Sequence, residues 1–158
     1  MENTNLNNEL MDTFVEMEDT AVAVSMELDI LRNPTTSMLC TVKGDDHKTK
    51  IKVYNAITDP TKKMDDMVNV PFKLKDVIAH PVDLVSEKTG EVETMLRTIL
   101  IDDKGNSYAG VSAGVVSALQ RVFAIFGQPN TWAEPINVKL VKRDTRNGNK
   151  VTTLIIVQ

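Results

Sequence analysis

Short runs of alternating apolar and polar residues, broken by turn residues, dominate the sequence after residue 36 and limit its fold more than any other feature. Alternation of this kind is typical of strands, because successive side chains leave opposite faces of an extended backbone. We expect strands over residues 38–43, 48–57, 72–79, 91–102, 136–143 and 151–157. Asn147-Gly148 and Lys88-Thr89-Gly90 have the composition of hairpin turns. Pro81 has no amide hydrogen, so we expect a bulge or a sheet edge there.

One strong helix signal interrupts these strands. Its apolar residues recur with the spacing of a single helical face, at Val115, Leu119, Val122 and Phe126. Ser112 is a suitable N-cap, and Gly127 followed by Pro129 ends the helix. Several short strands, one helix and a closing hairpin favour a small antiparallel barrel over a parallel α/β fold. The expected fold is therefore mainly β, an OB-like antiparallel β-barrel with one helix in the C-terminal half and an N-terminal extension.

The formal net charge of −4 conceals an asymmetry along the chain. Residues 1–31 contain eight acidic residues and no Lys or Arg, whereas the remainder has 18 basic residues against 14 acidic ones. Asn33-Pro34-Thr35-Thr36 is a breaker, so we expect an acidic N-terminal extension over residues 1–35 and a mildly basic domain over residues 36–158. The spacing before residue 31 favours a short helix and then a strand.

Lys48, Lys50, Lys52 and Tyr54 occupy alternate positions in the expected strand over residues 48–57. On a strand, three ammonium groups and a phenol ring would share one face, with apolar side chains on the other. Lysines neutralise phosphates and an aromatic ring stacks on a base, which together suit single-stranded nucleic acid. The alternative explanation is that exposed lysines protect a sheet edge from aggregation.

Further candidates come from the few aromatic residues and from the closing hairpin. Phe123 and Phe126 lie on the apolar face of the expected helix and belong to a core, which leaves two tyrosines and one tryptophan for base stacking. The hairpin is rich in Lys and Arg, although charges at a hairpin tip are usually only solvated. The candidate nucleic-acid-binding residues are Lys48, Lys50, Lys52, Tyr54, Arg97, Tyr108, Trp132, Lys139, Arg143, Arg146 and Lys150.

Signatures of catalysis are largely missing from the sequence. His47 and His80 have no partners at metal-ligand spacing, and Cys40 lies in an apolar run where a buried thiol is expected. A glycine-rich phosphate loop is also absent. We therefore expect a protein that is not an enzyme and that takes no metal and no cofactor. The single cysteine, the polar N-terminus and the lack of about 18 consecutive apolar residues predict a cytoplasmic protein without membrane contact.

Three stretches carry a resemblance to a known family. They are Lys50 to Thr58, Thr98 to Tyr108 ahead of the helix, and the closing hairpin from Val138 to Ile155. In this order they resemble the single-stranded DNA-binding proteins of small bacteriophages with protein-primed replication, over residues 36–157. The resemblance implies an OB-like fold and matches Tyr108 to an aromatic that the family keeps after its Asp-Lys-Gly-type turn. Tyrosines that the family places in the segment matching residues 78–90 are absent here.

The expected function is sequence-independent binding of single-stranded DNA, which coats and protects displaced strands during phage DNA replication in the bacterial host cytoplasm. The expected partners are single-stranded DNA and replication proteins, the latter through the acidic N-terminal extension. This extension is otherwise a solvated segment or a competitor of DNA for the basic domain. The alternative function is that of an acidic viral interaction or regulatory protein that binds a host or replication protein and not DNA. The sequence does not define an oligomeric state.

Overall fold

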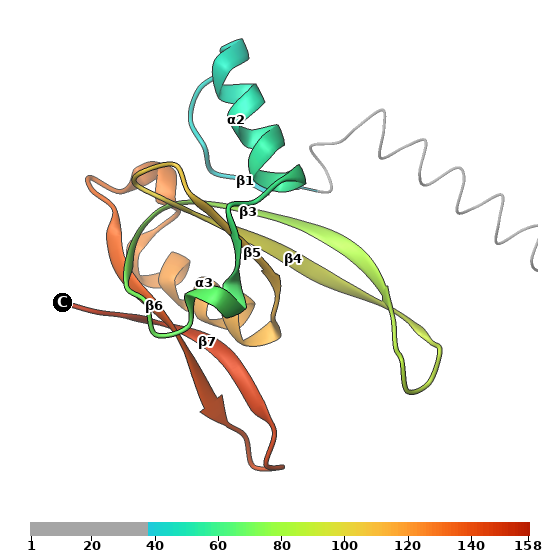
Figure 1. The fold of residues 1–158 in the computed structure, drawn as a ribbon. Coiled ribbons are helices and arrows are strands. Elements are labelled where there is room, and N and C mark those ends of the chain that lie inside the picture. Colours follow the sequence, from blue (N-terminus) through green and yellow to red (C-terminus); the bar gives the residue numbers. More distant parts are fainter. Residues whose placement is uncertain (1–37) are drawn as a thin grey trace, which may run out of the picture. The chain divides into compact units, whose positions relative to one another are not determined.

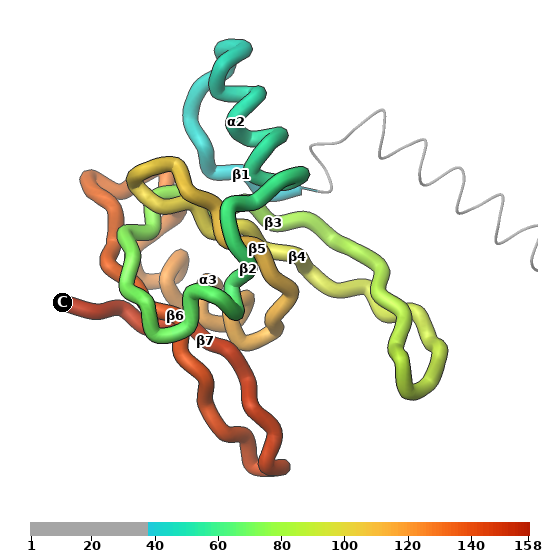
Figure 2. The backbone as a smooth tube through the Cα atoms, viewed as in Figure 1, coloured from blue at the N-terminus to red at the C-terminus, as the bar shows by residue number. Residues whose placement is uncertain are grey.

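A computed structural model of the protein describes residues 38–158 (Figures 1 and 2). The helix and strand predicted before residue 31 lie outside the described residues. The described chain forms a seven-stranded sheet in the order β2-β5-β4-β3-β6-β7, and β1 pairs separately with β3. The strands are β1 (Leu39–Cys40), β2 (Lys62–Lys63), β3 (Phe72–Val85), β4 (Val92–Asp102), β5 (Ser107–Val111), β6 (Ile136–Asp144) and β7 (Lys150–Ile156). The β2–β5 pair is parallel and the other strand pairs are antiparallel, so the sheet is mixed.

β3 organises the sheet because it changes partner along its 14 residues. It pairs with β6 over residues 72–74, with β1 at residues 78 and 79, and with β4 along most of its length. A register shift between Leu74 and Asp76 marks a β-bulge, which bends the strand and helps to curl the sheet. Pro81 lies opposite Leu96 of β4 and beyond the end of β1, so it has the edge position predicted for it.

Helix α3 (Ala113–Phe126) begins and ends where the sequence predicts. Ser112 Oγ accepts a hydrogen bond from the Val115 amide at 3.3 Å, and Gly127 follows the helix with a φ of 80°, which favours glycine. The remaining helices are α2 (His47–Thr58) and the 3-10 turns η2 (Met64–Met67) and η3 (Pro129–Thr131).

The prediction of a strand over residues 48–57 is wrong, because these residues form α2. Asp46 is the N-cap of this helix, and its Oδ2 accepts a hydrogen bond from the Thr49 amide at 3.2 Å. Val53, Ala56 and Ile57 then pack on the sheet at the i, i+3, i+4 spacing of a helix. The alternation of lysines concealed this spacing.

The apolar core has two parts, one on each face of the sheet. Val77 and Leu100 belong to the part beneath α3, whereas their neighbours Ile78 and Ile99 belong to the part beneath α2. Successive strand residues face opposite sides, so the two helices cover opposite faces. The larger part also takes in buried residues of α3, namely Val115, Ala118, Leu119 and Val122.

The predicted fold class is confirmed. The structure is mainly β, its sheet is curled as in an OB-like barrel, and α3 lies in the C-terminal half (Figure 1). The closing hairpin, the turn at Lys88-Thr89-Gly90 and the strand over residues 91–102 also lie where predicted. The sequence missed β5 and the two-residue strand β2. Among the described helices, none is long and apolar enough to cross a membrane.

Candidate nucleic-acid interface

Helical geometry separates the four residues that the sequence placed on one face of a strand. Residues four apart lie about 40° apart around a helix, whereas residues two apart lie about 200° apart. Lys48 and Lys52 therefore share one side of α2, and Lys50 and Tyr54 lie on the opposite side. Lys50 Nζ lies 3.3 Å from Asp45 Oδ1, and the Tyr54 side chain is 65% exposed. The predicted basic strip of residues 48–54 is wrong as a single surface.

Tyr108 is a core residue. It is only 5% exposed, and its ring packs edge-on against Phe72 with the ring centroids 4.9 Å apart. Its hydroxyl donates a hydrogen bond of 2.6 Å to Asp102 Oδ2. Burial and the neighbouring carboxylate raise the pKa of Tyr108 well above its usual range. The prediction that this ring stacks on a base is therefore wrong, because no face of it is open to a ligand.

Asp102 organises the turn between β4 and β5. Its Oδ1 accepts hydrogen bonds from the Lys104 amide at 2.9 Å and the Asn106 amide at 2.8 Å, and its Oδ2 accepts one from Asn106 Nδ2 at 3.1 Å. Burial acts to raise the pKa of Asp102, but these hydrogen bonds and that from Tyr108 outweigh burial and hold the pKa below its usual range. The turn thus presents Lys104 from a fixed backbone.

Arg97 ties the end of α2 to the sheet. Its Nη1 donates a hydrogen bond of 3.0 Å to the carbonyl oxygen of Ile57 and lies 3.3 Å from His80 Nε2. Ile57 is in the last turn of α2, where carbonyl groups lack partners within the helix. The guanidinium group therefore provides a hydrogen-bond donor for a carbonyl group at the C-terminal end of α2. Its predicted contact with nucleic acid stays a prediction.

The hairpin of β6 and β7, which we call the basic hairpin, carries a second group of charges. Lys142 Nζ lies 3.6 Å from Asp65 Oδ1, and Lys150 Nζ lies 2.9 Å from Asp144 Oδ1. Its other basic residues form no ion pair with any residue in the described range, and they are Lys139, Arg143 and Arg146. The tip of this hairpin extends away from the rest of the described sheet (Figure 1).

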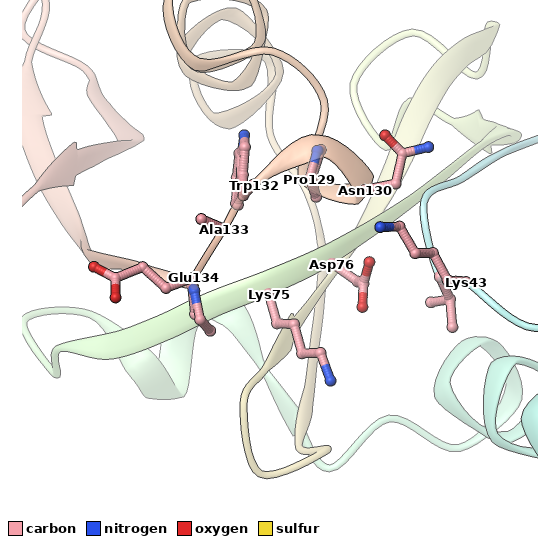
Figure 3. A pocket seen from close by; sticks show the side chains of 10 residues that line it. Lys43, Lys75, Asp76, Pro129, Asn130, Trp132, Ala133 and Glu134 are labelled. Atoms are coloured by element: carbon pink, nitrogen blue, oxygen red, sulfur yellow. The ribbon is translucent and has the colours of Figure 1, made fainter.

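Two adjoining cavities form a groove across the bulge of β3. The first, of about 290 Å³, lies between β3 and the segment from η3 to β6, with Trp132 in its wall (Figure 3). The second, of about 670 Å³, lies between α2, β3 and the β4–β5 turn. Both cavities are lined by Val42, Lys43, Lys75 and Asp76. We call the joined cavities the basic groove after the lysines that line them, which are Lys43, Lys52, Lys75 and Lys104. The lining also includes five acidic residues, which are Asp59, Asp76, Asp102, Asp103 and Glu134.

The β-bulge explains why Lys75 and Asp76 both face the groove. Leu74 and Val77 both belong to the core beneath α3, although residues three apart on a regular strand face opposite sides. The extra residue at the bulge removes this conflict and leaves two neighbouring side chains together above the sheet. The sequence analysis missed Lys43, Lys75 and Lys104. The break in alternation between Leu74 and Val77 was the available signal for the bulge.

Asp76 lies between two of the groove lysines. Figure 3 shows its carboxylate between Lys43 and Lys75. Thr41 Oγ1 donates a hydrogen bond of 2.9 Å to Asp76 Oδ1 and accepts one of 2.9 Å from the Val77 amide. Burial raises the pKa of the Asp76 carboxyl, while Thr41 and the two lysines act in the opposite direction. The Thr41 hydrogen bond therefore holds the carboxylate in place between the two lysines (Figure 3).

Trp132 has a fixed position in the groove wall. Its indole Nε1 donates a hydrogen bond of 3.0 Å to the Gly127 carbonyl oxygen, and its half-buried ring packs against the core. Of the predicted site residues, the groove therefore brings together Lys52 and Trp132. Lys48 continues the groove side of α2, whereas Tyr54 and Lys50 do not. Arg97 lies at the end of α2, and the basic hairpin is a separate surface. Apart from the correction for Tyr108, the DNA contacts of these residues stay predictions.

A curled, mainly β sheet with a lysine-lined groove and an aromatic wall is typical of proteins that bind single-stranded nucleic acid. Residues 33–157 match the family described as phage single-stranded DNA-binding protein. The chain belongs to this family, which confirms the resemblance found in the sequence and assigns the chain to single-stranded DNA binding in phage replication. No curated protein and no solved structure matches the chain.

Proposed function

We propose that single-stranded DNA lies in the basic groove, and that the chain acts there in the host cytoplasm as a strand-coating protein and not as an enzyme. The observation that carries this proposal is that lysines from distant parts of the chain converge on one groove. Lys43, Lys52, Lys75 and Lys104 come from four separate segments and line one continuous groove. Each ammonium group can neutralise a phosphate and release its counterion, which needs no particular base.

Trp132 is the ring that we propose for base contact. It lies in the groove wall, where its hydrogen bond to Gly127 fixes the indole before DNA arrives. A base stacked on an aromatic ring contributes about 1–3 kcal/mol, and every base has a face that can stack. Lysines and one ring together therefore fit binding without sequence preference.

Substitution of Asp76 should change DNA affinity in the opposite direction to substitution of the lysines. A phosphate that contacts Lys43 and Lys75 approaches the carboxylate between them, and like charges repel. Removal of either lysine should weaken DNA binding, whereas Asp76→Asn should strengthen it. The amide keeps an oxygen that can accept the Thr41 hydrogen bond.

The experiment is a titration with an oligothymidine just long enough to bind one molecule of the protein. Binding is followed through the fluorescence of Trp132, the only tryptophan of the chain. For Lys43→Ala with Lys75→Ala, the slope of log K against log salt should fall by about 0.7 for each phosphate that the protein no longer neutralises. Arg121→Ala on the exposed side of α3 is the matched control and should leave the slope unchanged. If the groove variant kept the wild-type slope, DNA would not bind in the groove.

The acidic N-terminal extension is proposed as the contact for replication proteins. Removal of residues 1–31 should then leave the affinity for the oligothymidine unchanged. A rise in affinity at low salt would instead favour the extension as a competitor of DNA, because electrostatic competition weakens as salt increases.

A further inference from the structure

The distal part of the β3–β4 hairpin, residues 81–96, is a two-stranded ribbon that lacks partners in the described chain. β1 pairs with β3 only as far as Ala79, and β5 pairs with β4 only from Arg97 onward. Beyond these points the two strands pair only with each other among residues 38–158. Figure 1 shows the ribbon extending beyond the rest of the described sheet. A ribbon of this kind is marginally stable alone in water and gains from a partner.

Both faces of this ribbon carry apolar side chains. Val85 lies directly opposite Val92 on one face, next to the hydrogen-bonded pair Asp83 and Thr94, and Leu84 lies opposite Glu93 on the other face. Val85 is 67% exposed and Val92 is 63% exposed. Exposed apolar side chains on a ribbon that has no partner among the described residues indicate a contact surface for a protein.

The ribbon is acidic, and this charge limits the kind of partner that it can bind. Four carboxylates accompany a single lysine, and they are those of Asp83, Glu87, Glu91 and Glu93 against Lys88. This charge repels phosphates, so the ribbon does not suit DNA, and it equally opposes the pairing of two ribbons. The partner must present basic and apolar side chains together.

The basic hairpin of the same chain has that chemistry. Lys139 lies opposite Ile155 and Arg143 opposite Val151, so cationic and half-exposed apolar side chains share one face, with the buried Val141 between the two basic residues. Lys139, Arg143 and Arg146 make no ion pair with the described residues. β6 spans about 25–30 Å from its start beside the groove, so its tip lies well away from the proposed DNA site.

We propose that the β3–β4 ribbon of one copy docks on the basic hairpin of the next copy along a DNA strand. The contact joins two different surfaces and is therefore head to tail, which generates an open chain of copies and not a closed pair. This inference rests on the proposed function, because copies that bind adjacent segments of one strand meet at high effective concentration. It adds cooperativity to the binding of single copies.

Charge reversal tests the contact in the full-length chain. Glu91→Lys with Glu93→Lys reverses the charge of these two ribbon residues. Arg143→Glu with Arg146→Glu reverses the charge of two residues of the basic hairpin. All four side chains are exposed and lie outside the groove lining. Each pair should lower the cooperativity parameter on long oligothymidine by about tenfold. A chain with both pairs should recover it, because its ribbon and hairpin are complementary again with opposite signs. Arg121→Glu, a reversal on the exposed side of α3, is the matched control and should change nothing.

Affinity for an oligothymidine that holds one copy separates this proposal from that of the groove. The ribbon variant should keep wild-type affinity there, whereas Lys43→Ala with Lys75→Ala should lose it. Unchanged cooperativity in either reversed variant, or no recovery in the combined chain, would overturn head-to-tail docking. A loss of short-oligothymidine affinity on reversal of the hairpin would also overturn it, since the hairpin would then contact DNA. If Lys43→Ala with Lys75→Ala kept wild-type affinity while the other variants behaved as expected, only the proposal that DNA lies in the groove would be overturned.

Discussion

α2 and α3 pack on opposite faces of one sheet, but they serve different purposes. Four residues of α3 are buried in the larger part of the core, whereas none of the described side chains of α2 is fully buried. α2 instead contributes Lys52 to the basic groove and contacts the sheet through a few half-buried residues. The comparison shows that α3 contributes to the core, while α2 contributes a lysine to the groove where we propose that DNA binds. It follows that substitutions on α3 should affect stability and those on α2 should affect binding.

The largest effect should come from Leu119→Ala on α3. Leu119 is 4% exposed, so truncation leaves a cavity and should lower the free energy of unfolding by about 2–5 kcal/mol. Ile51→Ala on α2 is the matched truncation of an aliphatic side chain, and its 46% exposure predicts a change within about 0.5 kcal/mol. Urea unfolding of both variants measures the difference. Equal losses would mean that α2 supports the fold as much as α3 does.

A smaller effect, confined to α2, should follow from Asp46→Ala. The hydrogen bonds from Thr49, first the hydroxyl and then the amide, hold the pKa of Asp46 below its usual range. The N-cap therefore stabilises the helix above the pKa that Asp46 has in the unfolded chain, and this stability is lost as the pH falls through the folded pKa. Hydrogen exchange should show the α2 amides exchanging several-fold faster in the variant at neutral pH, with the amides of α3 unchanged.

Asp45→Ala is the control for this cap. Asp45 is also exposed and acidic, and it pairs with Lys50 at the surface without capping the helix. Its removal should leave exchange in α2 close to that of the wild type. Faster exchange throughout the sheet in Asp46→Ala would contradict the idea that α2 is a separate, weakly held element.

The two helices also show what the sequence could and could not predict. α3 was predicted because its own apolar spacing and its two caps define it. α2 was mistaken for a strand because only Val53, Ala56 and Ile57 contact the sheet, and the alternating lysines gave a stronger local pattern. The β3–β4 and β6–β7 hairpins were predicted because their turns are local signals. Partners that are distant in the sequence have no such signal.

The groove illustrates the same limit. Lys43, Lys75 and Lys104 are separated by about 30 residues each, and a bulge in β3 helps to bring them together. The prediction for Tyr108 was wrong for a related reason, because it rested on the family resemblance and on the small number of aromatic residues, and neither shows whether the ring is buried. Its burial depends on Phe72 and on the Asp102 carboxylate. Only the assembled sheet distinguishes a stacking ring from a core ring.

The smallest effect should come from Tyr54→Ala, which contrasts the two sides of α2 itself. Tyr54 is exposed and lies opposite Lys52 around the helix, so its removal should change the free energy of unfolding by less than about 0.5 kcal/mol. The groove proposal also expects affinity for oligothymidine within about twofold of the wild type. Lys52→Ala, on the groove side, should weaken binding and lower its salt dependence.

Trp132 fluorescence measures both variants under the same conditions. A loss of about 1–3 kcal/mol in Tyr54→Ala would mean that a base stacks on this ring, as the sequence alone predicted. DNA would then pass over the outer side of α2, and the helix would be a binding platform on both sides. Unchanged affinity in Tyr54→Ala beside a loss in Lys52→Ala would instead limit the DNA to the side of the helix that faces Lys75 and Lys104.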